Sequence, residues 1–141
     1  MTTPSSPIHR LTELCSTLRE IEEAAAEKMT LAIAVIKKRN EAGEDIAPLV
    51  RILGTSRQTY YTRSKKISME QLPADAPSLE QLAVDLKELK SKIKWYESRR
   101  DALLSPALKQ TSWKDVISVT GLSSRAITYR KQNPEENPRE E

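Results

Sequence analysis

The sequence predicts an all-α protein, and three observations lead to that prediction. The 141 residues include only three glycines, which is few for a β-rich fold. No segment alternates apolar and polar residues for long, as a half-buried strand would. Alanine, leucine, lysine, glutamate and arginine, which favour helices, instead recur at helical spacing. The length suits one ordinary domain or two small ones.

The first predicted element is a long helix from about Ile8 to Asn40. Its apolar residues recur at alternating steps of three and four, the heptad spacing of a helix with one buried seam, and Glu22 is a polar break in it. Gly43 follows as the expected C-cap. The seam consists of Ile8, Leu11, Cys15, Leu18, Glu22, Ala25, Met29, Ala32 and Ile36.

A second long helix is predicted to begin at Leu79, with Ser78 as its N-cap. Glu80 and Asp85 are acidic residues near its start, where the helix dipole favours negative charge. Pro106 marks where this helix is expected to have ended. Its seam has the same spacing with a break at Arg100, and consists of Leu79, Leu82, Leu86, Leu89, Ile93, Tyr96, Arg100 and Leu103.

A short glycine-turn segment follows each long helix. In the first, Asp45 and Ser56 are the expected N-caps of two short helices, with Pro48 in the first turn of the earlier one and Gly54 between them. A glycine there allows the positive φ of a sharp turn.

The second segment has the same arrangement. Ser112 is expected to cap its first helix, with Asp115 three residues on as in a capping box. Gly121 forms the turn, Ser123 caps the last helix, and Asn133 before Pro134 ends it.

The two halves of the chain align with each other. Ile8 aligns with Leu79 at an offset of 71 residues, and Gly54 aligns with Gly121 at an offset of 67. We therefore expect an internal duplication: residues 1–66 form a long helix and the first glycine-turn segment, 67–78 a linker, 79–133 the second copy, and 134–141 a disordered acidic tail. The two long helices are expected to pack antiparallel or crossed.

Each glycine-turn segment resembles the helix-turn-helix motif of DNA-binding proteins. The resemblance covers Ile46–Lys65 and Trp113–Gln132, with glycine at the ninth place of each. The shared apolar places are the fourth, fifth, eighth and fifteenth, and the departures are Thr55, Thr120, Arg63 and Arg130. The matching residues are Leu49, Val50, Leu53 and Tyr60 in one copy and Val116, Ile117 and Ile127 in the other. The resemblance implies two trihelical heads in which the C-terminal part of each long helix is the first helix.

In that motif, the second short helix enters the major groove and places polar side chains at base edges. Arginine can bond guanine, glutamine can bond adenine, and a threonine methyl can touch thymine. Cations at the helix ends would meet phosphates. The predicted DNA-binding residues are Ser56, Arg57, Gln58, Tyr61, Thr62, Arg63, Lys65, Lys66, Ser123, Ser124, Arg125, Thr128, Tyr129, Arg130 and Lys131.

The distribution of charge agrees with this assignment. The chain has a net charge of +3, but residues 46–66 carry five cations and no acid. Residues 113–132 carry four cations and one acid, whereas the tail 133–141 carries four glutamates and one arginine. Two basic segments on near-neutral or acidic supports are what phosphate-binding surfaces require.

Other classes of function find little support in the sequence. One histidine, His9, and one cysteine, Cys15, cannot build a usual metal site or a Ser-His-Asp triad, so we expect no enzyme, catalytic residue, metal or cofactor. No apolar run approaches the length that a bilayer requires, so we expect no membrane partner and a cytoplasmic, nucleoid-associated protein.

The expected function is binding to double-stranded DNA, as a transcriptional regulator or a DNA-organising or partition factor. The alternative is an oligomeric interaction or assembly module, such as a phage packaging subunit or an adaptor, in which the glycine turns are only corners. The seams fit either a homodimer through the long helices or packing within one chain. The sequence does not separate DNA from RNA binding.

Overall fold

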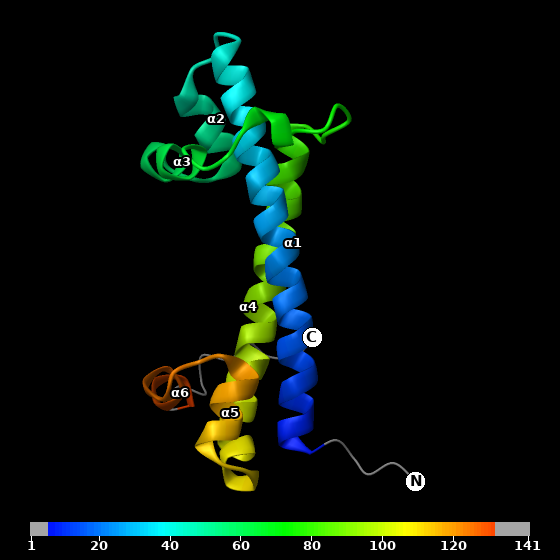
Figure 1. The fold of residues 1–141 in the computed structure, drawn as a ribbon, viewed down its shortest axis with the longest axis vertical. Helices are drawn as coiled ribbons and strands as arrows, with labels where there is room; N and C mark the ends of the chain where they lie inside the picture. Colours follow the sequence, from blue (N-terminus) through cyan, green and yellow to red (C-terminus); the bar gives the residue numbers. More distant parts are fainter. Residues whose placement is uncertain (1–5, 132–141) are drawn as a thin grey trace. The chain divides into compact units, whose positions relative to one another are not determined.

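The computed structural model describes residues 6–131, which form six α-helices, a short 3-10 turn and no strand (Figure 1). The prediction of an all-α fold with long helices is therefore confirmed for this part of the chain. In chain order the elements are α1 (Pro7–Glu41), α2 (Ile46–Leu53), α3 (Arg57–Ser64), η1 (Met69–Gln71), α4 (Leu79–Gln110), α5 (Trp113–Thr120) and α6 (Ser124–Lys131). The expected start of the tail, Asn133 with Pro134, and the acidic segment 134–141 lie outside the described residues.

The chain forms two compact units, and one of them combines segments from both ends of the sequence. The central unit is Glu23–Lys90, and the terminal unit combines Met1–Glu22 with Ser91–Glu141. The predicted segments 1–66 and 79–133 each contribute to both units, because each long helix has one part in each unit. A helical head therefore rests on parts of both long helices, and not on the preceding long helix alone.

The core of the central unit joins α1, α2, α3 and the start of α4. In this unit α1 and α4 are antiparallel. Nζ of Lys28 lies 3.2 Å from Oδ2 of Asp85. Further along α1, Nη1 of Arg39 lies 3.9 Å from Oε2 of Glu80, which comes earlier in α4. Ala32 and Ile36 of α1 and Leu79, Leu82 and Leu86 of α4 are buried there, as the heptad seams predict. The whole core of the unit, with α2 and α3 included, consists of Ala32, Ile33, Ile36, Leu49, Val50, Leu53, Tyr60, Leu79, Leu82 and Leu86.

The core of the terminal unit joins the start of α1, the end of α4, and α5 with α6. The backbone N–H of Ile8 donates to Oε1 of Gln110 at 3.0 Å, so the first turn of α1 lies beside the last turn of α4. Cys15, a member of the predicted seam, is buried here, and this burial raises the pKa of its thiol. The buried residues are Leu11, Cys15, Leu104, Ala107, Val116 and Ile127.

Pro106 does not end α4, contrary to the sequence prediction. The helix continues through it to Gln110. Leu104 and Ala107, on either side of the proline, are both fully buried in the terminal core. Their packing holds the helix together where proline removes a backbone hydrogen bond.

Asp45 precedes α2 at the expected N-cap, but its side chain makes no capping hydrogen bond. An N-cap side chain accepts from the second or third helical N–H. The third residue of α2 is Pro48, which has no N–H to donate. The other predicted caps are present: Ser56, Ser78, Ser112 and Ser123 each accept a hydrogen bond from the backbone N–H three residues on, at 3.1–3.2 Å.

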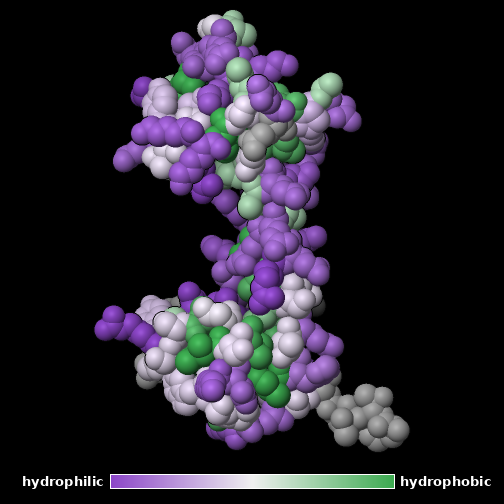
Figure 2. All heavy atoms as spheres, viewed as in Figure 1, coloured by the Kyte–Doolittle hydropathy of each residue, from purple (hydrophilic) through white to green (hydrophobic). Residues whose placement is uncertain are grey.

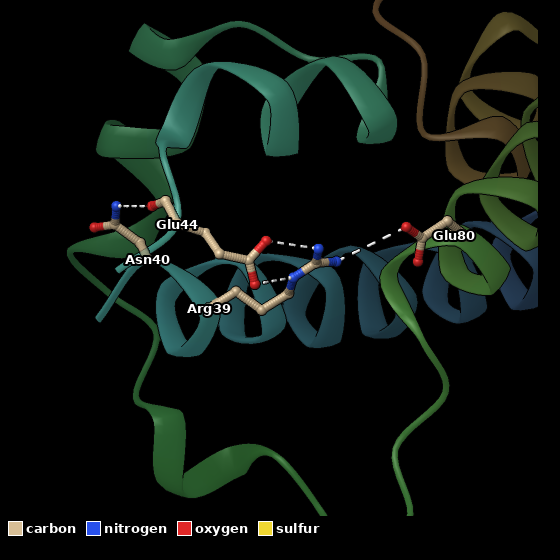
Figure 3. Close-up of polar contacts among 4 residues, drawn as sticks. All are labelled: Arg39, Asn40, Glu44 and Glu80. Carbon is tan, nitrogen blue, oxygen red and sulfur yellow. Dashed lines mark hydrogen bonds and ion pairs between the residues drawn. The ribbon is translucent and has the colours of Figure 1, made fainter. Parts of the chain in front are cut away.

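The start of α2 is tied to both long helices by a polar network around Arg39 (Figure 3). The Arg39 guanidinium donates to both carboxylate oxygens of Glu44, at 2.8 and 2.7 Å, and lies 3.9 Å from Glu80. Nδ2 of Asn40 donates to the backbone carbonyl of Glu44 at 2.8 Å. These contacts fix the loop that leads from α1 into α2 and thereby help to orient the α2/α3 pair.

Candidate nucleic-acid interface

The turn between α2 and α3 is built by Gly54, Thr55 and Ser56. Gly54 has φ of 80°, in the left-handed region that favours glycine. Its N–H donates to the carbonyl of Arg51, and the N–H of Thr55 donates to that of Val50, so the last carbonyls of α2 are satisfied. Ser56 then caps α3 through the N–H of Thr59 at 3.1 Å. Three residues thus reverse the chain without leaving these helix ends unpaired.

One face of α3 is held in the core of the central unit. Tyr60 is 3% exposed and Ser64 is 9% exposed, and these residues are one turn apart. Nζ of Lys37 donates to the carbonyls of Ser64 and Ile67, at 3.1 and 2.9 Å, at the negative end of the α3 dipole. Both ends of this short helix are therefore anchored.

The opposite face of α3 is exposed and basic. Tyr60 and Ser64 are the buried residues of α3, Thr59 is half-buried, and its other residues are exposed. Figure 2 shows hydrophilic side chains over the α3 region of the central unit. Every predicted DNA-binding residue of this copy is exposed: Ser56, Arg57, Gln58, Tyr61, Thr62, Arg63, Lys65 and Lys66.

The turn between α5 and α6 has the same length and the same glycine conformation. Gly121 has φ of 74°, and its N–H donates to the carbonyl of Ile117 at 2.8 Å. Thr120, one of the departures from the motif, has a local structural role. Its hydroxyl donates to the Val116 carbonyl at 2.8 Å and accepts from the Leu122 N–H at 3.1 Å. A polar residue is tolerated there because its hydroxyl is fully used within the turn.

Helix α6 is anchored by Ile127, which is completely buried. Ser123, Ser124, Arg125 and Tyr129 are exposed, whereas Thr128, Arg130 and Lys131 are half-buried. The exposed basic face of α6 is therefore smaller than that of α3. Trp113, at the start of α5, is 41% exposed.

Arg130 has an intramolecular partner that the sequence did not indicate. Its Nη1 lies 3.6 Å from Asp101 Oδ2, and Nε of Arg100 donates to the other oxygen of Asp101 at 3.1 Å. Arg100 is the polar break of the α4 seam, and it is 6% exposed. Two guanidiniums thus share one carboxylate, and Arg130 connects α6 to α4.

No group of three or more histidine, cysteine, aspartate or glutamate side chains gathers within residues 6–131 in a way that could hold a metal ion. No helix in that range is long and apolar enough to span a bilayer.

No protein-family model matches this chain, and no curated protein and no solved structure matches it. The assignment of a function therefore rests on the chain's own residues.

Proposed function

We propose that the protein binds double-stranded DNA through two non-identical helix-turn-helix modules, the α2/α3 pair and the α5/α6 pair. The observation that carries the proposal is the exposed face of α3. It presents Arg57 and Gln58 in the first turn and Lys65 and Lys66 just past the last, and residues 46–66 contain no acid. Such a surface suits base edges at one end and phosphates at the other.

The second module supports the same function with fewer cations. Ser124 and Arg125 occupy the first turn of α6 and are exposed, as Arg57 and Gln58 are in α3. Arg125 is the cation of its first turn, and the pairing of Arg130 with Asp101 occupies one of the cations at the phosphate end. The two modules share helix lengths of eight residues and a three-residue turn with a left-handed glycine. This similarity supports the proposed duplication.

The biological role that we infer is that of a transcriptional regulator or a DNA-organising factor. Both roles need affinity for duplex DNA and neither needs a catalytic group. The exposed large apolar side chains on the candidate surfaces are Tyr61 and Tyr129, at 51% and 65% exposure. Tyrosine has an apolar ring and a polar tip, so it can lie against sugars and phosphates without requiring a protein partner.

The proposal is tested by the salt dependence and base preference of DNA binding in two variants. Arg57→Ala is expected to weaken binding to the preferred sequence by about 1–3 kcal/mol and to relax preference at one base pair. Lys65→Ala is expected to weaken binding to all duplexes alike and to reduce the slope of log affinity against log salt concentration by about one.

Arg19→Ala is the matched control, because Arg19 is also exposed but lies on α1 of the terminal unit. Equal binding by Arg57→Ala, Lys65→Ala and the control would remove the assignment of α3. Absence of salt-dependent binding to any duplex would favour the interaction module over the DNA-binding protein. Stronger competition by duplex RNA would also contradict the proposal, because the A-form major groove is too narrow for α3.

A further inference from the structure

A second surface of the central unit has a different chemistry from the α3 face. It is a groove between the end of α2 and the first half of α4, with a volume of about 320 Å³. Leu53 and Leu86 are both buried and form its floor, and Ala83 lines one wall. Gly54 lies at one end of the groove and contributes no side chain. The groove can therefore receive apolar side chains from outside.

Two large apolar residues lie exposed in this groove. Val84 of α4 is 53% exposed and Ile52 of α2 is 36% exposed. Neither belongs to the buried core, whereas Leu53 and Leu86, which form the groove floor, do. Together with Leu53, Ala83 and Leu86 they form one contiguous apolar lining, and a contiguous apolar surface marks a binding site more than scattered exposed residues do.

The rim of the groove is cationic. Lys87 and Lys90 of α4 line it and are both exposed, at helical spacing from Ala83 that puts all three on one face. The described residues that line the groove include no acid. Glu80, Asp85 and Glu88 of α4 are not among these lining residues, so the charge of the lining itself comes from Lys87 and Lys90 alone.

We propose that this groove docks an amphipathic helical segment of a partner protein, with aliphatic side chains on one face and carboxylates beside them. The aliphatic side chains would replace water over Ile52, Leu53 and Val84, and the carboxylates would pair with Lys87 and Lys90. Helix-in-groove docking has this combination of apolar anchors and charged flanks. Duplex DNA would satisfy the lysines but would leave the aliphatic floor without a partner.

The test uses the full chain and two synthetic helical peptides that carry a fluorescent label. One peptide has leucines on one face and glutamates on the other, and the second has lysines in place of the glutamates. Fluorescence anisotropy is expected to show saturable binding of the glutamate peptide and at least about tenfold weaker binding of the lysine peptide. Val84→Asp is expected to weaken binding of the glutamate peptide by about tenfold or more, because the substitution places a desolvated charge in the contact.

Reversing the charge of the groove lysines provides a more specific test of the proposal. Lys87→Glu combined with Lys90→Glu is expected to weaken binding of the glutamate peptide and to strengthen binding of the lysine peptide. Lys94 is an exposed lysine of α4 outside the groove, and Lys94→Glu should leave the binding of both peptides unchanged. Equal binding of the two peptides, or no effect of Val84→Asp, would overturn the proposal.

Two further measurements identify other occupants. Sedimentation that shows self-association of the wild type and its loss in Val84→Asp would assign the groove to a second copy of the chain, and would overturn the proposal. A parallel loss of duplex binding in Val84→Asp would assign it to DNA, with the same consequence. Since the peptide experiment contains no DNA, its result is separate from the fate of the proposed DNA-binding function.

Discussion

At the scale of single residues, Asp101 is the most informative position in the terminal unit. Its carboxylate contacts two guanidiniums and its side chain is 15% exposed, while that of Arg100 is 7% exposed. One guanidinium nitrogen of Arg100, Nη2, is buried without a hydrogen-bond partner among the described residues. The cluster therefore depends on Asp101 for most of its compensation.

Asp101→Asn is expected to lower the free energy of unfolding by about 3 kcal/mol, because it leaves a buried cation without its countercharge. Arg100→Met is expected to be nearly neutral, because it replaces the cation by an apolar side chain at an apolar seam position. Urea unfolding of both variants measures the difference. A smaller loss in Asp101→Asn than in Arg100→Met would contradict this account of the cluster.

A second residue-scale prediction concerns Glu44 and acid. The bidentate hydrogen bonds from Arg39 hold the pKa of Glu44 below its ordinary value of 4.5. A carboxyl whose pKa is lowered by folding stabilises the protein above that ordinary value, and the contribution is lost as the pH falls through the lowered pKa. The melting temperature is therefore expected to fall as the medium is acidified below pH 4.5.

Glu44→Gln should reduce that acid dependence while lowering the melting temperature near neutral pH. Glu20→Gln, a change at an exposed glutamate of α1, serves as the matched control and should leave the acid dependence as it is in the wild type. Thermal melts of the three proteins across the acid range provide the measurement. Parallel curves for Glu44→Gln and the wild type would show that the Arg39 network does not contribute.

At the scale of secondary-structure elements, the glycine turns determine where α3 and α6 begin. Gly54 has φ of 80°, and a Cβ built there would meet nothing within 4 Å. Gly54→Ala should therefore destabilise the protein by about 1–2 kcal/mol through backbone strain alone. Gly54→Asn should cost less, since asparagine adopts the left-handed conformation more readily. Equal stabilities of the two variants in urea unfolding would argue against strain as the cause.

The proline within α4 leads to an opposite expectation. Pro106 is exposed, and as a proline it cannot donate the hydrogen bond that the carbonyl of Ala102 would otherwise accept. Pro106→Ala should therefore raise the free energy of unfolding, by up to about 3 kcal/mol. The matched control is Ala102→Ser, an exposed change in the same helix that leaves Pro106 in place. A lower stability of Pro106→Ala would mean that the proline has a packing role.

The elements also show what the sequence could and could not predict. The heptad seams predicted the buried residues at the start of α4 and most of those in α1, whereas Leu104 and Ala107, which are fully buried near the end of α4, lie outside its seam. The serine caps and glycine turns predicted the boundaries of the short helices, because these signals are local. The prediction that α4 ends at Pro106 was wrong, because the tertiary packing of Leu104 and Ala107 keeps the helix intact beyond the proline. The pairing of Arg130 with Asp101 was missed because it joins residues from different elements. The division into two units depends on which helix ends pack together, and a local sequence pattern does not predict such long-range packing.

At the scale of the whole molecule, the proposed function predicts an asymmetric DNA target. The residues at the corresponding positions are Ser56, Arg57 and Gln58 in one module and Ser123, Ser124 and Arg125 in the other. Since arginine and glutamine prefer different bases, one chain should select two unlike half-sites. Sequencing of DNA fragments bound from a random pool provides the measurement, together with the sedimentation mass of the bound protein.

A variant with both modules alike makes this prediction decisive. Ser124→Arg combined with Arg125→Gln gives the second module the same three residues as the first, and all three of the altered or retained positions are exposed. The selected DNA should then change from two unlike half-sites to a repeated one. The non-specific affinity at low salt should stay within about twofold, because one cation is gained at position 124 and one is lost at position 125, so the net charge of the module is unchanged. If the wild type already selects only perfect palindromes, each bound unit must contain two copies of one module, and the second module is then a structural support and not a base-contacting one.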